Sequence, residues 1–204
     1  MKQQDRVFHP AGRLRWVLLA VAGVLALCVA VTVLLVVFLP EDAPMPEPVE
    51  KEYTFYPVYE GNILESPEYL DLDRQIYFYD RNFNAREALD ESQISSDGEL
   101  QLLVDYLNSL ISGEPDTCRA LFTESALAEH PVPDFAQQMI YCITLSVAGQ
   151  EERDGMLCRT YCVDYMIHRN NGTYRRDVGS DAIRSEYITV IAVADGEYRI
   201  DSIR

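Results

Sequence analysis

The chain has 204 residues, of which 33 are acidic and 17 are Lys or Arg, so its formal net charge is −16 at pH 7. A surface this acidic repels nucleic acid, and the sequence therefore predicts no nucleic-acid partner. It contains no motif typical of a catalytic centre or a bound cofactor, so we expect no cofactor.

The amino-terminal region divides into a basic flank, residues 1–16, and an apolar, uncharged segment, residues 17–39. As a helix this segment is ~35 Å long, enough to cross a hydrocarbon core of ~30 Å. The basic flank before it and the acidic residues after it predict a cytoplasmic tail at 1–16. We therefore expect a single-pass cell-membrane protein with an extracellular carboxy-terminal domain. A cleavable signal peptide is the alternative, although its apolar region is normally only about 7–15 residues long.

Two segments of distinct composition follow the apolar stretch. Residues 40–52 are rich in Pro and Glu, which favours an extended spacer. Residues 53–96 form a segment that is rich in aromatic residues between Tyr53 and Phe83 and too apolar for an exposed linker. We expect it to dock on the following domain, with a short strand at 75–79. A partner-binding groove is the alternative, because exposed aromatic patches mark interfaces.

Helical spacing of apolar residues begins the last segment, residues 97–204. Ser96 and Glu99 have the spacing of a capping box, and Gly113 ends the helix that follows them. Pro115 is well placed as the first residue of a second helix, which ends before His130. These helices predict an αα-hairpin.

Alternating apolar and polar residues predict strands in the remainder of the chain. Asn171-Gly172 and Asp195-Gly196 are typical of tight turns between antiparallel strands. The expected strands cover residues 139–148, 156–167, 183–194 and 198–203.

This order of elements resembles the nuclear transport factor 2-like superfamily, in which amino-terminal helices pack against a long, curved antiparallel sheet. The run DGEYRIDSI, Asp195 to Ile203, is similar to the ending of that superfamily, where an aromatic residue is common at the position of Tyr198. The resemblance implies an α+β fold: one amino-terminal transmembrane helix, then a domain with an αα-hairpin packed against a curved antiparallel sheet of about four strands. Members of the superfamily include enzymes, ligand-binding domains and scaffold subunits, so the resemblance does not choose a function.

Tyr141, Tyr161 and Tyr165 are the candidate wall of a cavity, because alternation places them on the face of the sheet that meets the helices. In enzymes of the resembled superfamily such a cavity holds an Asp or His beside a Tyr for proton abstraction or dehydration. Strand alternation places Asp164 on the opposite face of the sheet. No His is expected on the same face as the tyrosines. We therefore interpret them first as core residues with hydrogen-bonded hydroxyls, and second as the wall of a small-ligand pocket.

A weak candidate metal site consists of residues with the spacing of ligands in an EF-hand-like calcium loop: Asp80, Asn82, Asn84 and Glu91. Ala85 stands where such a loop needs Gly, and a non-Gly residue in the left-handed region costs ~1–2 kcal/mol. The sequence therefore favours an ordinary polar loop without metal.

Cysteines outside the apolar segment stand at positions 118, 142, 158 and 162. If the strands at 139–148 and 156–167 pair around a loop at 149–155, Cys142 lies opposite Cys162. These two residues are the candidate disulfide, because extracellular cysteines form disulfides when their Cα atoms are close. Four free thiols are the alternative.

Since no acid/base constellation is apparent, the sequence predicts a membrane-anchored, extracytoplasmic binding or assembly domain without catalytic activity, from a bacterial source. Its expected partners are the membrane and an envelope protein or a second copy of the chain. Two alternatives remain open. One is a scaffold subunit of a secretion or conjugation-type envelope complex, which has a similar topology. The other is a cavity-based acid/base enzyme or small-ligand binder.

Overall fold

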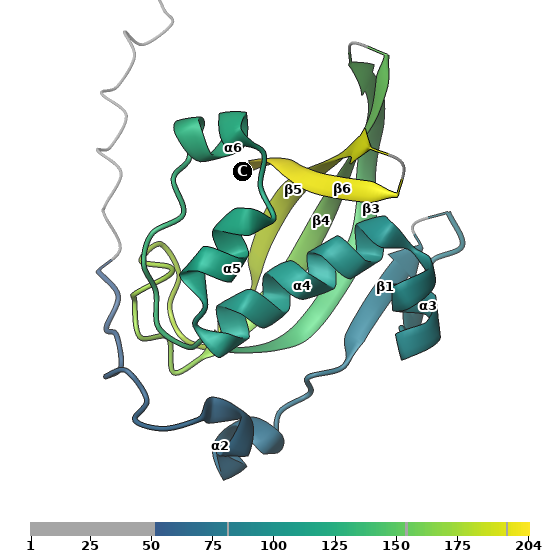
Figure 1. Ribbon diagram of the computed structural model, residues 1–204. Helices are drawn as coiled ribbons and strands as arrows, with labels where there is room; N and C mark the ends of the chain where they lie inside the picture. Colours follow the sequence, from purple (N-terminus) through teal and green to yellow (C-terminus); the bar gives the residue numbers. More distant parts are fainter. Residues whose placement is uncertain (1–51, 81, 154, 195) are drawn as a thin grey trace, which may run out of the picture. The chain divides into compact units, whose positions relative to one another are not determined.

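The computed structural model describes residues 52–204 except Arg81, Asp154 and Asp195 (Figure 1). Its helical elements are η1 (Ile63–Glu65), α2 (Pro67–Leu70), α3 (Glu91–Ser96), α4 (Gly98–Ser112), α5 (Pro115–Ala120) and α6 (Glu124–Glu129). Its strands are β1 (Ile76–Asp80), β2 (Ala85–Ala88), β3 (Met139–Arg153), β4 (Met156–His168), β5 (Arg184–Ala194) and β6 (Glu197–Ile203).

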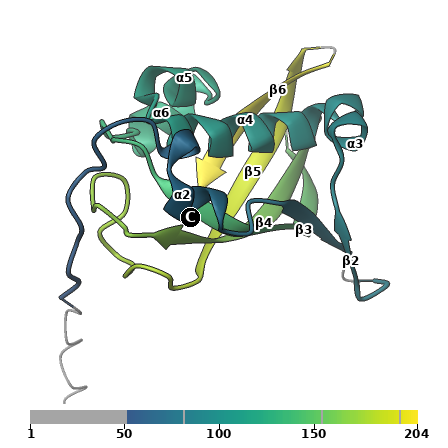
Figure 2. The same cartoon turned by 90° about the horizontal axis from the view of Figure 1, so that it is seen from below.

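The strands form one six-stranded sheet in the order β2-β1-β3-β4-β5-β6. β1 runs parallel to β3, with Ile76 opposite Ile143, whereas the other neighbouring strands are antiparallel. A parallel pair needs a long crossover connection. Here the crossover contains α3 to α6, and Figure 2 shows α4, α5 and α6 on the same side of the sheet.

The long helix α4 supplies much of the core. Its amino terminus is capped by Asp97, whose carboxylate accepts hydrogen bonds from the backbone N–H groups of Glu99 and Leu100. It ends at Gly113, which has φ +69°, and a Cβ there would lie 2.6 Å from the backbone nitrogen of Gln137. The predicted end at Gly113 is therefore confirmed, and the cap is Asp97 rather than Ser96. Fully buried side chains of α4 pack with sheet residues in one core: Leu103, Leu107, Leu110, Ile140, Leu145, Val163 and Ile188.

The expected fold class is wrong. The sheet has six strands rather than about four, it is mixed rather than antiparallel, and α5 and α6 replace the single second helix of the predicted αα-hairpin. The helix breaks because residues 121–123 bond to β6: Ile200 N–H donates to Leu121 O, and Thr123 N–H donates to Ile200 O, both at 2.9 Å. The Thr123 side chain then caps α6.

The candidate disulfide is also wrong, because the β3–β4 hairpin is longer than predicted. Arg153 pairs with Met156, so residues of the expected 149–155 loop belong to the strands. This register sets Ser146, not Cys142, opposite Cys162. An offset of four strand residues corresponds to ~13 Å, beyond the ~7 Å Cα separation that a disulfide allows. Cys142 is a free thiol.

The predicted membrane span, residues 17–39, the cytoplasmic tail, residues 1–16, and most of the 40–52 spacer lie outside the described residues. Within residues 52–204, leaving aside the three positions named above, no helix is long and apolar enough to cross a membrane. The expected single-pass membrane localisation, with an extracellular carboxy-terminal domain, is therefore not upheld by the structure.

The aromatic segment after residue 52 lies along the loop that follows β4. Tyr56 N–H donates to the carbonyl of Asn170 at 2.9 Å. The Phe55 ring lies against Gly172, where a Cβ would come within 2.7 Å of the ring. Further along, Ile63 is fully buried and its N–H donates to Gln137 Oε1 at 3.0 Å. These contacts join residues 55–63 to residues 137 and 170–172, which are far away in the sequence.

Candidate functional site

A buried carboxylate, Glu186 of β5, is the centre of a polar cluster between α4 and the sheet. Glu186 is fully buried and accepts hydrogen bonds from the hydroxyls of Tyr106, at 2.9 Å, and Tyr165, at 2.8 Å. It also forms an ion pair with Arg175. The Tyr174 hydroxyl contacts the Tyr106 hydroxyl, and because the Tyr106 proton points to Glu186, Tyr174 donates to Tyr106. We call these five residues the Glu186 cluster.

The charges in the Glu186 cluster are balanced. Burial raises the pKa of Tyr106, Tyr165 and Tyr174 above the ordinary tyrosine value, so all three hydroxyls are protonated at neutral pH. Arg175 is always positively charged. One guanidinium therefore matches one carboxylate, and the hydroxyls act as hydrogen-bond donors.

A pocket of about 190 Å³ opens beside this cluster, and we call it the Arg175 pocket. Most of its lining is apolar, and its residues are Phe122, Ala126, His130, Pro131, Val132, Pro133, Tyr174, Arg175 and Ile203. The Nε–H group of Arg175 is buried and has no hydrogen-bond partner among the described residues. An unpaired buried donor costs about 1–3 kcal/mol, and the Nε–H group of Arg184 is a second such donor in the described part of the chain.

The connection between β4 and β5, residues 169–183, carries Tyr174 and Arg175. Fully buried Asn170 holds this loop, since its Nδ2 donates to the carbonyls of Arg175, at 3.1 Å, and Val178, at 2.9 Å. The tight hairpin predicted at Asn171-Gly172 is wrong, because the chain continues through this loop before β5 begins.

Tyr161, the second predicted cavity residue, lies in a separate polar cluster. Its hydroxyl donates to Glu99 at 2.5 Å, and Arg159 Nη1 binds the same carboxylate oxygen at 2.8 Å. Burial raises the pKa of Tyr161 above the ordinary tyrosine value. We call these three residues the Glu99 cluster. The structure thus separates Tyr161 from Tyr165.

Tyr141, the third predicted cavity residue, does not join either cluster. Its hydroxyl donates to Asp181 at 2.9 Å, and His168 Nδ1 lies 2.9 Å from the same oxygen. The expected alternation fails here because Cys142, with φ +53°, lies in a bulge where the register shifts between Tyr141 and Thr144. Burial, together with the bond to Asp181, raises the pKa of Tyr141 to about 12.

Sequence reasoning missed both carboxylates that bind the buried tyrosines. The premise that the inward tyrosines have no carboxylate partner is therefore wrong. The sequence pattern does predict that Glu186 is buried, because alternation along the strand places it on the same face as Ile188 and Val190, which are both buried. Glu99 was interpreted only as a capping residue. No short motif points to Arg175, whose position depends on the loop.

The candidate metal ligands are not brought together. Asp80 ends β1, and its carboxylate accepts a hydrogen bond from Asn82 N–H in the turn before β2. The Asn84 side chain accepts a bond from the Tyr79 hydroxyl at 2.6 Å. Glu91 begins α3, beyond the far end of β2. Throughout the part of the chain that the structure describes, no group of three or more His, Cys, Asp and Glu side chains is placed to hold a metal ion.

Comparisons with known proteins give no relative for this chain: no family model, no curated protein and no solved structure matches it. The resemblance to the nuclear transport factor 2-like superfamily stays a prediction.

Proposed function

We propose that this domain binds a small, uncharged, largely apolar ligand in the Arg175 pocket and does not convert it chemically. The observation that carries the proposal is the apolar pocket lined by Arg175, a residue whose buried Nε–H is a donor without an acceptor among the described residues. A ligand carbonyl or ether oxygen would supply that acceptor. The apolar walls, with Phe122, Val132 and Ile203, would bury the rest of the ligand.

The charge balance favours an uncharged ligand. Glu186 already compensates Arg175, so a ligand carboxylate would add a second negative charge to a partly buried site without a new partner. The volume sets the size of the ligand. At about 190 Å³ the pocket is smaller than the ~300–1,000 Å³ typical of drug-sized ligands.

Binding without catalysis is favoured by the state of the polar groups. A general base needs a pKa near the working pH and a free lone pair directed at the substrate. The tyrosine hydroxyls of the Glu186 cluster have raised pKa values, and Glu186 is fully buried and occupied by three donors. None of these groups is poised to take a proton from a ligand.

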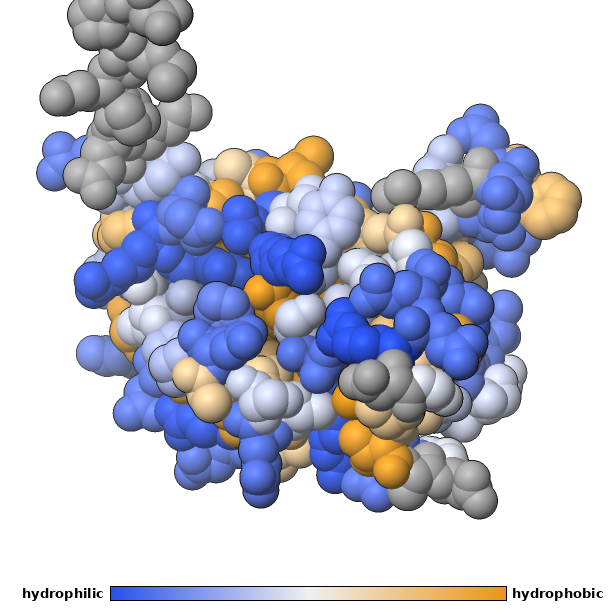
Figure 3. All heavy atoms as spheres, turned by 90° about the horizontal axis from the view of Figure 1, so that it is seen from above, coloured by the Kyte–Doolittle hydropathy of each residue, from blue (hydrophilic) through white to orange (hydrophobic). Residues whose placement is uncertain are grey.

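A small-molecule ligand is also favoured over a broad protein contact on one side of the molecule. The face drawn in Figure 3 is mostly hydrophilic, and its apolar side chains lie in small, separate groups. Protein interfaces of monomeric domains are typically marked by larger contiguous apolar patches. The scaffold alternative stays a prediction.

Fragment binding followed by two-dimensional NMR tests the proposal. Cyclohexanone, a small apolar carbonyl compound, should shift the amide signals of Ala126, Val132 and Ile203 in the ¹⁵N-labelled chain. Cyclohexanecarboxylate, of similar shape but charged, should bind at least about tenfold more weakly, which corresponds to ~1.4 kcal/mol.

A pocket-filling variant supplies the control. Val132→Phe should abolish the cyclohexanone shifts, whereas Val147→Phe, on an exposed part of β3, should leave them unchanged. Equal binding of the ketone and the carboxylate, or shifts that survive in Val132→Phe, would contradict the proposal.

A further inference from the structure

The aromatic segment begins with an extended stretch, residues 53–60, which we call the strap. It lies beside the loop at 169–183, and Figures 1 and 2 both draw the two next to each other at one end of the domain. None of the strap residues belongs to the main core. The strap is therefore attached at the surface of the domain, on the loop that carries Arg175.

Two rings of the strap pack on two glycines of this loop. The Phe55 ring lies against Gly172, and the Tyr53 ring lies against Gly179, where a Cβ would come within 3.1 Å of the ring. Gly172 and Gly179 stand on either side of Arg175 in the chain. The strap therefore contacts the loop both before and after the residue that lines the proposed ligand pocket.

Asn170 connects the strap to Arg175. Its backbone carbonyl accepts the bond from Tyr56 N–H, while its buried side chain donates to the carbonyl of Arg175, at 3.1 Å, and accepts from Gly172 N–H, at 2.9 Å. The guanidinium of Arg169 lies over the Tyr56 ring, 5.3 Å from its centre, which is within the range of a cation–π contact. Asn170 thus bonds the strap with its backbone and shapes the loop with its side chain.

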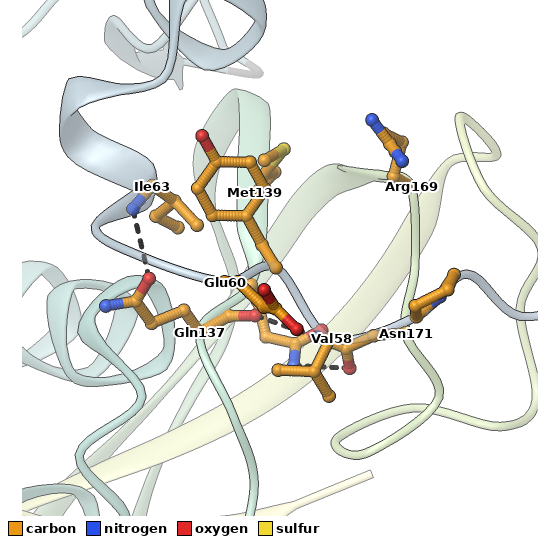
Figure 4. Close-up of a pocket in the computed structure, with 10 residues that line it drawn as sticks. Val58, Glu60, Ile63, Gln137, Met139, Arg169 and Asn171 are labelled. Atoms are coloured by element: carbon orange, nitrogen blue, oxygen red, sulfur yellow. Dashed lines mark hydrogen bonds between the residues drawn. The ribbon is translucent and has the colours of Figure 1, made fainter.

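The part of the strap after Tyr56 runs along a pocket. Residues 57–60 are exposed and form one wall of this pocket, which has a volume of about 180 Å³ (Figure 4). The chain is fixed again at Ile63, which is fully buried and whose N–H donates to Gln137 Oε1. The attachment at residues 53–56 is therefore separate from the attachment at Ile63.

Few contacts hold the attachment at residues 53–56. In the described part of the chain, Tyr56 N–H makes the only backbone–backbone hydrogen bond of the strap, and Tyr53 and Phe55 are half-buried. Regions with few buried apolar contacts open locally at low free energy. The first part of the strap can therefore leave the loop while Ile63 and the core stay in place.

We propose that the docked strap holds Arg175 in its ligand-binding position, so that release of the strap lowers the affinity of the Arg175 pocket. This coupling rests on the function proposed above for that pocket. With the strap released, the loop samples more conformations and only the molecules with Arg175 in place bind the ligand, which weakens the apparent affinity. Because coupling between two equilibria is reciprocal, a bound ligand in turn tightens the docking of the strap.

Native-state amide hydrogen exchange of the full ¹⁵N-labelled chain tests the hold of the strap on the loop. Tyr53→Ala combined with Phe55→Ala should speed exchange of the Gly172 amide at least about tenfold, because its hydrogen bond lies within the loop. Exchange of the Leu107 amide in α4 should stay unchanged, since the core remains folded. Thr54→Ala, at the exposed position between the two rings, is the matched control and should change neither rate.

Ligand affinity tests the coupling to the pocket. The same double variant should bind cyclohexanone at least about threefold more weakly, whereas Thr54→Ala should bind it as tightly as the unmodified chain. Saturating cyclohexanone should slow exchange of the Tyr56 amide in the unmodified chain at least about threefold.

The outcomes separate this coupling from the proposed function. An unmodified chain that does not bind cyclohexanone would overturn both. Binding by the unmodified chain with no loss of affinity in the double variant, or with no change in Gly172 exchange, would overturn the coupling alone. Faster Leu107 exchange would mean that the double variant loosens the core. The effect of cyclohexanone on Tyr56 in the unmodified chain then decides, and no slowing there would overturn the coupling.

Discussion

The two buried carboxylate clusters attach α4 to the sheet in different ways. At the start of the helix, Glu99 reaches from α4 to Tyr161 and Arg159 of β4. Near its middle, Tyr106 reaches from α4 to Glu186 of β5. Seven helical residues, or ~10 Å, separate Glu99 and Tyr106 along the helix axis. Both clusters contain Glu, Tyr and Arg. The carboxylate comes from the helix in the first cluster and from the sheet in the second.

The clusters differ in burial and in what their arginines leave unpaired. The Arg159 and Glu99 side chains of the first cluster are 28% and 10% exposed, compared with 21% and 0% for Arg175 and Glu186 in the second. Glu186 is fully buried, and Arg175, which lines a pocket, keeps a buried Nε–H without a hydrogen-bond partner among the described residues. Glu99 also lies in the first turn of α4, where the helix dipole favours a negative charge. We therefore interpret the first cluster as a structural contact and the second as part of the proposed ligand-binding site.

The largest expected effect is the loss of the Glu186 carboxylate. Glu186→Leu leaves the Arg175 charge partly buried and unpaired, and should lower the free energy of unfolding by about 3–5 kcal/mol. Glu99→Leu should cost only about 1–2 kcal/mol, because Glu99 is partly exposed and binds two donors, Tyr161 and Arg159, whereas Glu186 is fully buried and binds three. Urea denaturation followed by circular dichroism measures both values.

A second substitution tests the cause of that loss. Arg175→Met added to Glu186→Leu should recover part of the stability, since removing both charges leaves no unpaired ion. Equal losses for Glu186→Leu and Glu99→Leu, or no recovery in the double variant, would show that burial does not distinguish the clusters.

Alkaline pH should act more strongly on the Glu186 cluster, which contains three tyrosines with raised pKa values, than on the Glu99 cluster, which contains one. In the unfolded chain tyrosine titrates near pH ~10, and in the folded chain these residues keep their protons to higher pH. The unfolded state therefore binds fewer protons above pH ~10. Stability is fully present below that pH and falls as the pH rises, by ~1.4 kcal/mol for each unit between the two pKa values.

The pH dependence of stability is measured by urea denaturation at increasing pH, with tyrosinate absorbance as a second signal. Tyr106→Phe combined with Tyr165→Phe should flatten the fall in stability above pH ~10 more than Tyr161→Phe does. A steeper dependence on Tyr161 would reverse the ranking of the clusters.

Single hydroxyl deletions should follow the same order with smaller effects. Tyr106→Phe removes the bond to Glu186 and the acceptor for Tyr174, and should cost about 2–3 kcal/mol. Tyr161→Phe leaves Glu99 paired with Arg159, and should cost about 1–2 kcal/mol. Thermal and urea unfolding of the two variants give the comparison, and an equal or opposite order would argue against it.

Local sequence signals predict the elements on which both clusters stand. The spacing of leucines and the Gly113 end predict α4, and alternation predicts most of β4, β5 and β6. Parity alone places Tyr161 and Tyr165 toward the core, and it would have placed Glu186 there too. These features depend on the spacing of apolar residues and on the residue types at turns, and both can be read from a short stretch of sequence.

The features that local signals miss depend on contacts between distant residues. The bulge at Cys142 turns Tyr141 away from the interior, and the Cys142 N–H bonds to the carbonyl of Asp73, far away in the sequence. The parallel β1–β3 pair and the break between α5 and α6 likewise arise from contacts with other strands. Arg175 reaches Glu186 only because Asn170 fixes the loop. The residue spacing and composition of a single segment do not reveal these contacts, because each contact joins two distant parts of the chain.

The smallest expected loss of stability comes from removing the Tyr174 hydroxyl, which is the outermost hydroxyl of the Glu186 cluster. Tyr174→Phe removes one neutral hydrogen bond, to Tyr106, while the ring keeps its edge contact with Phe135 at 5.3 Å. The free energy of unfolding should fall by about 0.5–1.5 kcal/mol, less than in Tyr106→Phe, because Tyr106 still donates to Glu186. Tyr198→Phe is the matched control, since the Tyr198 ring packs beside Gly98 and its hydroxyl has no hydrogen-bond partner among the described residues. Urea denaturation of both variants decides the point. A Tyr174→Phe loss as large as that of Tyr106→Phe would mean that Tyr174 belongs to the structural centre of the cluster and not to the pocket wall.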